Sequence, residues 1–170
     1  MTKALVLALF LGMIFPLSAT ADSLAKFEGG IGVIPVSSAA GVQNLDGTFP
    51  NVNRNVVRGV NPAGQIWVIA GLSADVDLDG RITVDGRGLL LGGGNNVGTN
   101  ANQSVRATLI CGAAAPFTLH SSGLVPLEPN GDFRIDDLLS PAPPDPCNTP
   151  VLLIRNPAGA WFAAGIPKLD

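Results

Sequence analysis

Apolar and polar residues alternate with a period of two over residues 56–91, near the middle of the chain. This period is typical of strands, and the stretch predicts three strands joined by turns at 61–64 and 78–80. The first turn, Asn-Pro-Ala-Gly, recurs at 156–159, and a tryptophan follows each copy. Such a repeat arises from a duplicated hairpin or from convergent turn chemistry, and the sequence leaves both explanations open.

The second turn sets the pairing register of the ribbon. A three-residue turn over 78–80 places Gly80 in the left-handed conformation that this turn type requires, and it sets Val76 opposite Ile82. Continued outward, the same register sets Trp67 opposite Leu91. A slip of one residue would move every side chain to the other face, so the match of apolar pairs favours this register.

The two faces of the predicted ribbon differ in polarity. One face is apolar along its whole length and carries Val68, Ala70, Leu72, Ala74 and Val76 opposite Leu90, Gly88, Gly86, Val84 and Ile82. The other face is polar near the turn, where Asp75 opposes Thr83, and apolar at the far end. We expect the glycines to leave room above Leu72 or to admit another backbone. We expect Trp161 to cover the far end of the polar face.

Other short segments with strand-like patterns follow one another between turns rich in Gly, Pro and Asn. They span 27–36, 104–111, 117–119, 124–128, 132–138, 151–155 and 160–166. We expect 124–128 to pair with 132–138, and 151–155 with 160–166. No helical periodicity occurs after residue 21. The sequence therefore predicts an all-β fold, an antiparallel β-sandwich or barrel-like sheet of about 8–10 strands.

The first 21 residues have the pattern of a signal peptide. Lys3 supplies the charge, residues 4–14 the apolar segment, and Ala19-Thr20-Ala21 the small residues of a cleavage site. We expect cleavage there, which leaves one all-β domain over 22–170 with no membrane-spanning segment, secreted or periplasmic. Loss of Lys3 leaves nine basic and thirteen acidic residues. This acidic balance argues against nucleic acid as a partner and leaves an unidentified extracellular ligand or surface partner.

The chain has two cysteines, Cys111 and Cys147. In an exported protein an even number of cysteines predicts a disulfide, and two thiols alone do not make a zinc site. The loop would enclose about 35 residues, for which the chain-entropy model gives about 4 kcal/mol of stabilisation.

A calcium loop is one interpretation of Asp75, Asp77 and Asp79, which with Gly80 match the start of the D-x-D-x-D-G pattern. The twelfth position of such a loop should bring a bidentate carboxylate, and here it is Gly86. A plain hairpin tip with its aspartates in solvent is the favoured interpretation, so we expect no metal and no cofactor.

A hydrolase would need a base and a nucleophile, and His120-Ser121-Ser122 with Asp136 or Asp137 is the one candidate. Adjacent strand residues point to opposite faces, so His120 would not reach Ser121, and we expect a surface histidine. The two tryptophans, Trp67 and Trp161, are either core residues or a partly exposed aromatic platform for flat ligands such as sugar rings.

Several motifs occur in a recognisable order: a Gly-Arg-Gly-Leu-Leu-Leu strand (86–91), Ala-Thr-Leu-Ile-Cys (107–111), Pro-Asn-Gly-Asp-Phe-Arg-Ile (129–135), a proline-rich loop with Cys147, and Trp-Phe-Ala-Ala (161–164). In this order the chain resembles a group of small, secreted, two-cysteine bacterial all-β proteins with no assigned function. The resemblance covers residue 56 to the C-terminus. It implies export and the disulfide, and it brings no functional residues.

Two functions stay open. The first is a non-enzymatic exported module with a binding or structural role outside the cytoplasm, and the alternative is a secreted hydrolase of unknown substrate. One histidine, no tyrosine and no expected free thiol make a small inventory of reactive groups, which favours the non-enzymatic module.

Overall fold

The computed structural model describes residues 22–38, 45–46 and 52–168. The signal-peptide prediction therefore lies outside the described residues. Within them the chain forms thirteen strands and no helix. The strands are β1 (Ser23–Gly32), β2 (Val36–Ser38), β3 (Val52–Arg54), β4 (Trp67–Val68), β5 (Gly71–Asp77), β6 (Arg81–Arg87), β7 (Leu90–Leu91), β8 (Ser104–Ile110), β9 (His120–Ser121), β10 (Val125–Pro126), β11 (Phe133–Leu138), β12 (Val151–Arg155) and β13 (Trp161–Pro167).

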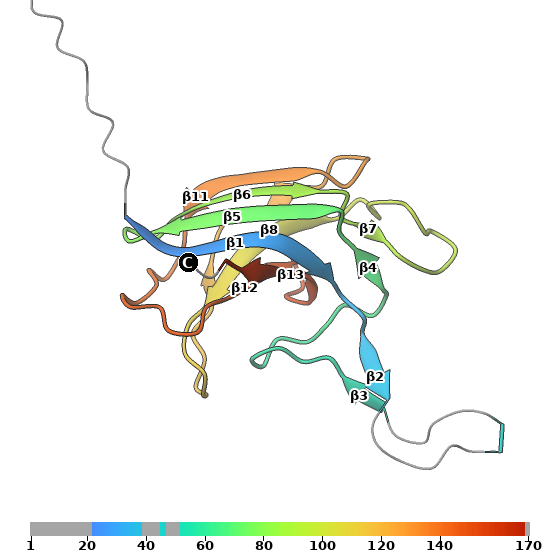
Figure 1. Cartoon of the computed structure of the whole chain (residues 1–170). Helices are drawn as coiled ribbons and strands as arrows, with labels where there is room; N and C mark the ends of the chain where they lie inside the picture. The colour runs from blue at the N-terminus through green and yellow to red at the C-terminus, as the bar shows by residue number, and fades with distance from the viewer. Residues whose placement is uncertain (1–21, 39–44, 47–51, 169–170) are drawn as a thin grey trace, which may run out of the picture.

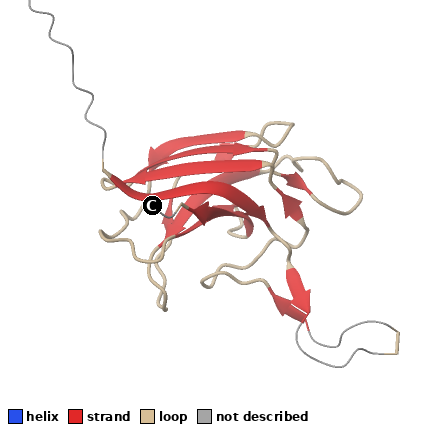
Figure 2. Ribbon diagram, in the orientation of Figure 1, coloured by secondary structure: helices blue, strands red, loops and turns tan. Residues whose placement is uncertain are grey.

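Nine of these strands form one antiparallel sheet that curls into a nearly closed, barrel-like shape (Figures 1 and 2). The order is β10-β8-β12-β13-β1-β5-β6-β11, and β9 also pairs with β8. The two ends of the sheet meet through β9, because Ser121 and Ser140 donate their backbone N–H groups to each other's carbonyls, both at 2.9 Å. The predicted all-β antiparallel fold is confirmed. The β2–β3 ribbon lies apart from the barrel (Figure 1).

The predicted register of the central hairpin is confirmed. Gly80 has φ +84° and donates to the carbonyl of Asp77 at 3.0 Å, and β5 and β6 pair with Val76 opposite Ile82. The register continues beyond this hairpin, since β4 and β7 place Trp67 opposite Leu91. A local three-residue turn therefore sets the pairing of strands that lie far from it along the ribbon.

The prediction of one apolar face along the whole ribbon is wrong beyond Gly88. The ribbon is interrupted between β6 and β7, where Gly88 has φ +62°. Past the interruption, Val68 is 48% exposed and Trp67 only 4%. Trp67 stacks on Phe162 of β13, with ring centroids 4.0 Å apart and planes at 12°. The face that is polar on β5–β6 is therefore the buried face of β4–β7.

The barrel interior is filled by side chains from alternate positions of its strands. Large side chains that are less than 2% exposed include Ile82, Leu109, Ile135, Leu152 and Ile154. Gly86 faces this interior, and a Cβ added there would overlap the ring of Phe133, its partner on β11. The room predicted above this glycine is thus taken by an aromatic ring from the neighbouring strand.

The segment 55–66 packs on β12–β13 instead of forming the predicted strand beside 66–76, so that prediction is wrong. Trp161 donates its backbone N–H to Asn61 and its carbonyl accepts from Ala63, both at 3.0 Å. Its Nε1 donates to the carbonyl of Asn55 at 2.9 Å. Leu152, Leu153 and Ile154 are all fully buried. Because neighbouring residues of a strand point to opposite faces, β12 is covered on both faces.

The two Asn-Pro-Ala-Gly segments have different structures. Residues 156–159 form the predicted hairpin turn between β12 and β13, with Gly159 at φ +91°. Residues 61–64 join no hairpin, and Pro62 instead forms a parallel bridge with Trp161. The duplicated-hairpin explanation of the repeat therefore has no structural support.

One predicted strand pair is replaced by another. Glu128 and Asp132 close the expected turn, with Gly131 at φ +84° and a 2.9 Å hydrogen bond from the N–H of Glu128. β10 then pairs with β8 instead of β11, which pairs with β6. The predicted pairing of 124–128 with 132–138 is wrong, because the end of the sheet needs β10 as a partner for β8.

The disulfide is present, with Cys111 bonded to Cys147 across 36 residues. It joins the end of β8 to the proline-rich segment before β12. Next to it, Arg58 donates to the carbonyls of Ile110 at 2.9 Å and Thr149 at 2.6 Å. The segment 55–66 and the disulfide loop are therefore held at the same end of β8.

Candidate binding face

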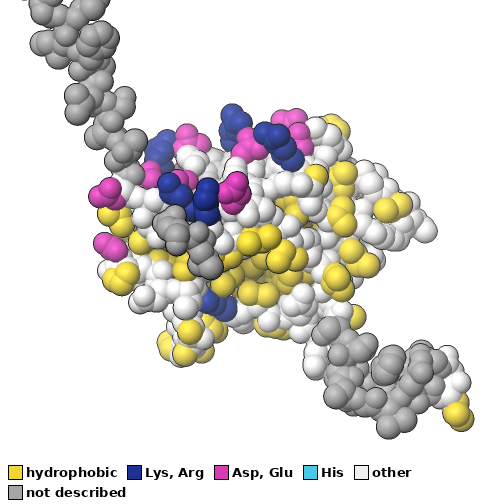
Figure 3. Space-filling view, viewed as in Figure 1, with side chains coloured by type: hydrophobic (Ala, Val, Ile, Leu, Met, Phe, Trp, Pro, Cys, Tyr) yellow, Lys and Arg dark blue, Asp and Glu magenta, His cyan; other side chains and the backbone are white. Residues whose placement is uncertain are grey.

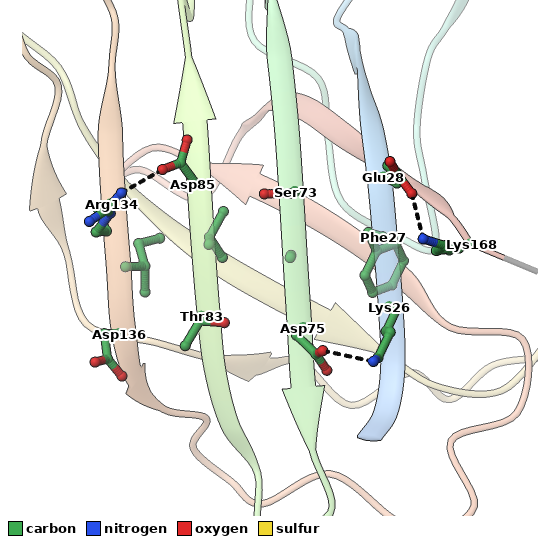
Figure 4. A pocket seen from close by; sticks show the side chains of 13 residues that line it. Lys26, Phe27, Glu28, Ser73, Asp75, Thr83, Asp85, Arg134, Asp136 and Lys168 are labelled. Carbon is green, nitrogen blue, oxygen red and sulfur yellow. Dashed lines mark hydrogen bonds and ion pairs between the residues drawn. The ribbon is translucent and has the colours of Figure 1, made fainter. Parts of the chain in front are cut away.

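The outer face of β1, β5, β6 and β11 is polar. Its strands turn Phe27, Ala74, Val84 and Ile135 inward, so the residues between these point to solvent. The outward side chains are Lys26 and Glu28 on β1, Ser73 and Asp75 on β5, Thr83 and Asp85 on β6, and Arg134 and Asp136 on β11 (Figure 4). We call these eight residues the polar face.

The polar face forms an open depression of about 550 Å³ across the four strands. Ser73 and Thr83 lie on its central strands, and longer charged side chains stand on either side, with Lys168 at the β1 edge (Figure 4). Positive and negative side chains are mixed on this part of the surface (Figure 3). The same central strands also carry Asp75 and Asp85, so hydroxyl and carboxylate groups alternate in the middle of the depression.

The charged residues of the polar face are ion-paired with one another or with immediate neighbours. The pairs join Lys26 Nζ to Asp75 at 3.3 Å, Lys168 Nζ to Glu28 at 2.8 Å, Arg134 Nη2 to Asp85 at 2.7 Å, Arg87 Nε to Asp85 at 3.1 Å, and Arg81 Nη2 to Asp136 at 2.6 Å. Opposite charges therefore balance locally on this face.

These contacts hold the carboxylates in their ionised form. A hydrogen bond from Arg134 lowers the pKa of Asp85 most, and a hydrogen bond from Arg87 lowers it further. A hydrogen bond from Lys168 lowers the pKa of Glu28. The pKa of Arg134 is raised by the same contact with Asp85. A general acid needs the opposite, a raised pKa that keeps its proton near neutral pH. These two carboxylates are suited to accept hydrogen bonds and not to donate protons.

The calcium candidates lie along the hairpin and bond locally. Asp75 accepts from Ser23 Oγ at 2.6 Å and pairs with Lys26, whereas Asp79 Oδ1 accepts from the backbone N–H of Arg81 at 2.9 Å. Within the described part of the chain, no three or more His, Cys, Asp or Glu residues form a group that could hold a metal ion. The local contacts of Asp75 and Asp79 are those of a hairpin tip, and the absence of a bound metal stays a prediction.

The hydrolase candidates are separated by their hydrogen bonds. His120 is 4% exposed, not on the surface as expected, and its Nδ1 lies 2.7 Å from the carbonyl of Pro141. Ser121 Oγ bonds Thr108 Oγ1 at 3.0 Å, and Ser122 Oγ donates to the carbonyl of Gly123 at 2.9 Å. His120 is buried because β9 lies between β8 and Ser140, two residues beyond the end of β11. No base–nucleophile contact is present among these residues.

Asp136 and Asp137, the acidic residues of the hydrolase hypothesis, make different contacts. Asp136 pairs with Arg81, whereas Asp137 accepts from the N–H groups of Gly123 at 2.7 Å and Leu138 at 2.8 Å. These backbone hydrogen bonds lower the pKa of Asp137. Asp137 therefore holds the β9–β10 connection against β11.

Both tryptophans are buried. Trp67 is 4% exposed and Trp161 is 3% exposed. Trp161 is covered by the segment 55–66, and Trp67 is covered by Phe162. Neither ring offers a free face to a ligand in this structure, so ligand binding by Trp67 or Trp161 stays a prediction without geometric support.

The sequence showed only half of the polar face. The pairing of Asp75 with Thr83 was predicted from the hairpin and is confirmed, and the same register sets Ser73 opposite Asp85. Lys26 and Glu28 on one side, and Arg134 and Asp136 on the other, were missed because the pairing of β1 and β11 with this hairpin depends on distant segments. Their alternation with apolar neighbours is the signal that marks them as outward residues.

Comparison with known proteins gives no match to a family model, a curated protein or a solved structure. The described residues contain no helix of the length and hydropathy needed to cross a membrane.

Proposed function

We propose that this protein is a non-enzymatic binding module that acts outside the cytoplasm, and that its polar face binds a neutral, hydroxyl-rich ligand such as an oligosaccharide. The observation that carries the proposal is the network of balanced ion pairs around the hydroxyls of Ser73 and Thr83. The disulfide supports the location, because disulfides persist in oxidising compartments.

The chemistry of the network fits hydroxyl groups. A sugar hydroxyl both donates and accepts hydrogen bonds, and a fixed carboxylate–guanidinium pair such as Asp85–Arg134 offers both partners side by side. A charged ligand would have to compete with the existing partner of each residue, whereas a neutral ligand leaves the pairs intact. The local balance of charge therefore favours a neutral ligand.

The shape fits an extended ligand bound weakly. The depression is open and crosses four strands, so it can receive a chain laid over the sheet. Phe27, the aromatic residue beside it, is only 2% exposed and provides no stacking surface. Binding then depends on hydrogen bonds in contact with water, and we expect dissociation constants of about 1–10 mM for short oligosaccharides.

Chemical-shift mapping tests the proposal. Neutral oligosaccharides of different composition are titrated into the labelled protein, and amide shifts are expected at 26–28, 73–75, 83–85 and 134–136. Arg134→Gln removes one donor of the central ion pair and should weaken binding, whereas Arg54→Gln on β3 is the matched control and should not. Absence of shifts with every sugar, or shifts confined to other strands, would refute the proposal.

A further inference from the structure

Two arginines lie directly opposite each other on the outer face of β8 and β12. Arg106 of β8 is the cross-strand partner of Arg155 of β12. The alternation of β8 turns Val105 and Ala107 into the barrel, so Arg106 points away from it. Like charges directly opposite each other destabilise an antiparallel pair unless something compensates them.

No carboxylate compensates this pair within the described residues, because none of their ion pairs includes Arg106 or Arg155. Arg155 Nε donates to the carbonyl of Gly159 at 2.9 Å, and its Nη1 lies 3.5 Å from Thr108 Oγ1. Burial is the main cause that lowers the pKa of Arg155, and the positive charge of Arg106 lowers it further. The positive charge of the two guanidinium groups is therefore left unbalanced in a partly desolvated position.

Arg106 has an unused donor in this position. Its Nε is buried and has no hydrogen-bond partner. Buried donors are nearly always satisfied, so an orphaned one indicates an absent partner. Arg58, another arginine without a carboxylate, shows the contrast. It donates to the carbonyls of Ile110 and Thr149 and lies over the ring of Phe117, 5.8 Å from its centroid.

We propose that Arg106 and Arg155 form a binding site for an oxyanion, phosphate or sulfate, free or as the monoester of a small sugar. The guanidinium nitrogens that make no hydrogen bond in this structure can donate to the oxygens of such an anion, which would also screen the like charges. Because Arg106 Nε is buried, its hydrogen bond to the anion requires a shift of the Arg106 side chain. Thr108 Oγ1 is buried and lies between Arg155 Nη1, at 3.5 Å, and Ser121 Oγ, at 3.0 Å, so it helps to position Arg155 and does not itself face the anion. The site is distinct from the polar face, because β13 lies between β12 and β1 in the sheet.

The net charge of the chain limits the size of the ligand. The formal net charge is −3, so a long polyanion would be repelled by most of the molecule while only two arginines attract it. A single phosphate or sulfate group fits the two guanidinium groups without this cost. The site therefore suits a small anion better than a nucleic acid.

Calorimetric titration and thermal unfolding test the site, each at constant ionic strength with chloride as the reference. Inorganic phosphate, sulfate and glucose 6-phosphate are titrated into the purified protein, with glucose as the neutral control. Binding of the anions, and a rise of the melting temperature with phosphate but not chloride, are expected. Arg106→Gln and Arg155→Gln should each weaken binding at least about tenfold. Arg54→Gln, on β3 and outside both proposed sites, should leave it unchanged.

The melting temperature of the variants without ligand provides a second readout. Here the substitution is expected to stabilise the protein, whereas it weakens anion binding. In phosphate-free buffer Arg106→Gln should raise the melting temperature by about 1–3 °C, because it removes the like-charge pair. Binding of inorganic anions but not glucose 6-phosphate would assign the site to the free ion. Equal affinity in the wild type and both glutamine variants would overturn the proposal. Binding of the protein to vesicles of anionic phospholipid, without binding of any of the titrated anions, would also overturn the proposal.

Discussion

Replacement of Trp161 by alanine separates the core role of this ring from a ligand-binding role. Trp161 is 3% exposed, and its Nε1 donates to the carbonyl of Asn55 at 2.9 Å. Loss of a buried tryptophan typically costs about 3–5 kcal/mol of unfolding free energy, because the surroundings collapse only in part. At about 2–4 °C per kcal/mol, the melting temperature should fall by about 6–20 °C.

Trp161→Phe is the matched control. It keeps a ring in the site and removes the Nε1–H donor, so the cost should be about 1–2 kcal/mol, mostly from the lost hydrogen bond and the smaller ring. Urea unfolding followed by circular dichroism measures both variants without depending on tryptophan fluorescence. The two variants compare loss of the whole ring, in Trp161→Ala, with loss of the Nε1–H donor and part of the ring, in Trp161→Phe.

A small effect of Trp161→Ala on stability would contradict the buried position of this ring. If Trp161→Ala changes the unfolding free energy by less than about 1 kcal/mol, the ring is not packed as the structure places it. Iodide quenching of the wild-type fluorescence is the independent check, and both buried rings should resist it. Strong quenching would return the aromatic platform to consideration.

Three further predictions follow from the fold. Gly86→Ala should destabilise the protein by about 1–3 kcal/mol because its Cβ overlaps the ring of Phe133, and Phe133→Leu should recover part of this loss in a double-mutant cycle measured by urea unfolding. Stability should fall as the pH drops below the ordinary aspartate pKa near 3.8, because the lowered pKa of Asp137 favours the folded state only while the carboxylate is ionised; Asp137→Asn should flatten this part of the pH profile. Calcium and EDTA should leave the melting temperature unchanged, and a drop of several degrees with EDTA that calcium reverses would contradict the hairpin interpretation of 75–79.

The sequence predicted local pairing well because turn chemistry determines it. Gly80 requires a left-handed conformation, and the three-residue turn that provides it determines the register from Val76 to Trp67. The turn at 156–159 worked in the same way for β12 and β13. In each case the deciding residues lie within a few positions of the pairs they set.

Pairing between distant segments could not be predicted in this way. β10 has a turn that points it toward β11, yet it pairs with β8, since closure of the sheet offers a partner that local chemistry does not show. The burial of His120 has the same origin, because β9 is covered only when both ends of the sheet meet. The polar face was missed in part for this reason, as its outer strands β1 and β11 lie far along the chain from the β5–β6 hairpin that they flank.

The filled interior directs the search for function to the outside of the barrel. A barrel of eight or nine strands is wide enough to hold a small ligand when its inward side chains are small. Here Gly86 and Gly165, which would open such a space, are covered by the rings of Phe133 and Phe27. The strands around them contribute fully buried Leu, Ile and Val side chains. Since aromatic rings occupy the places that the glycines leave, a ligand of this protein has to bind to an outer face. The two proposed sites, the polar face and the Arg106–Arg155 pair, lie on the outside of the barrel and differ in chemistry, and the substitutions that test them replace side chains that point away from the packed interior.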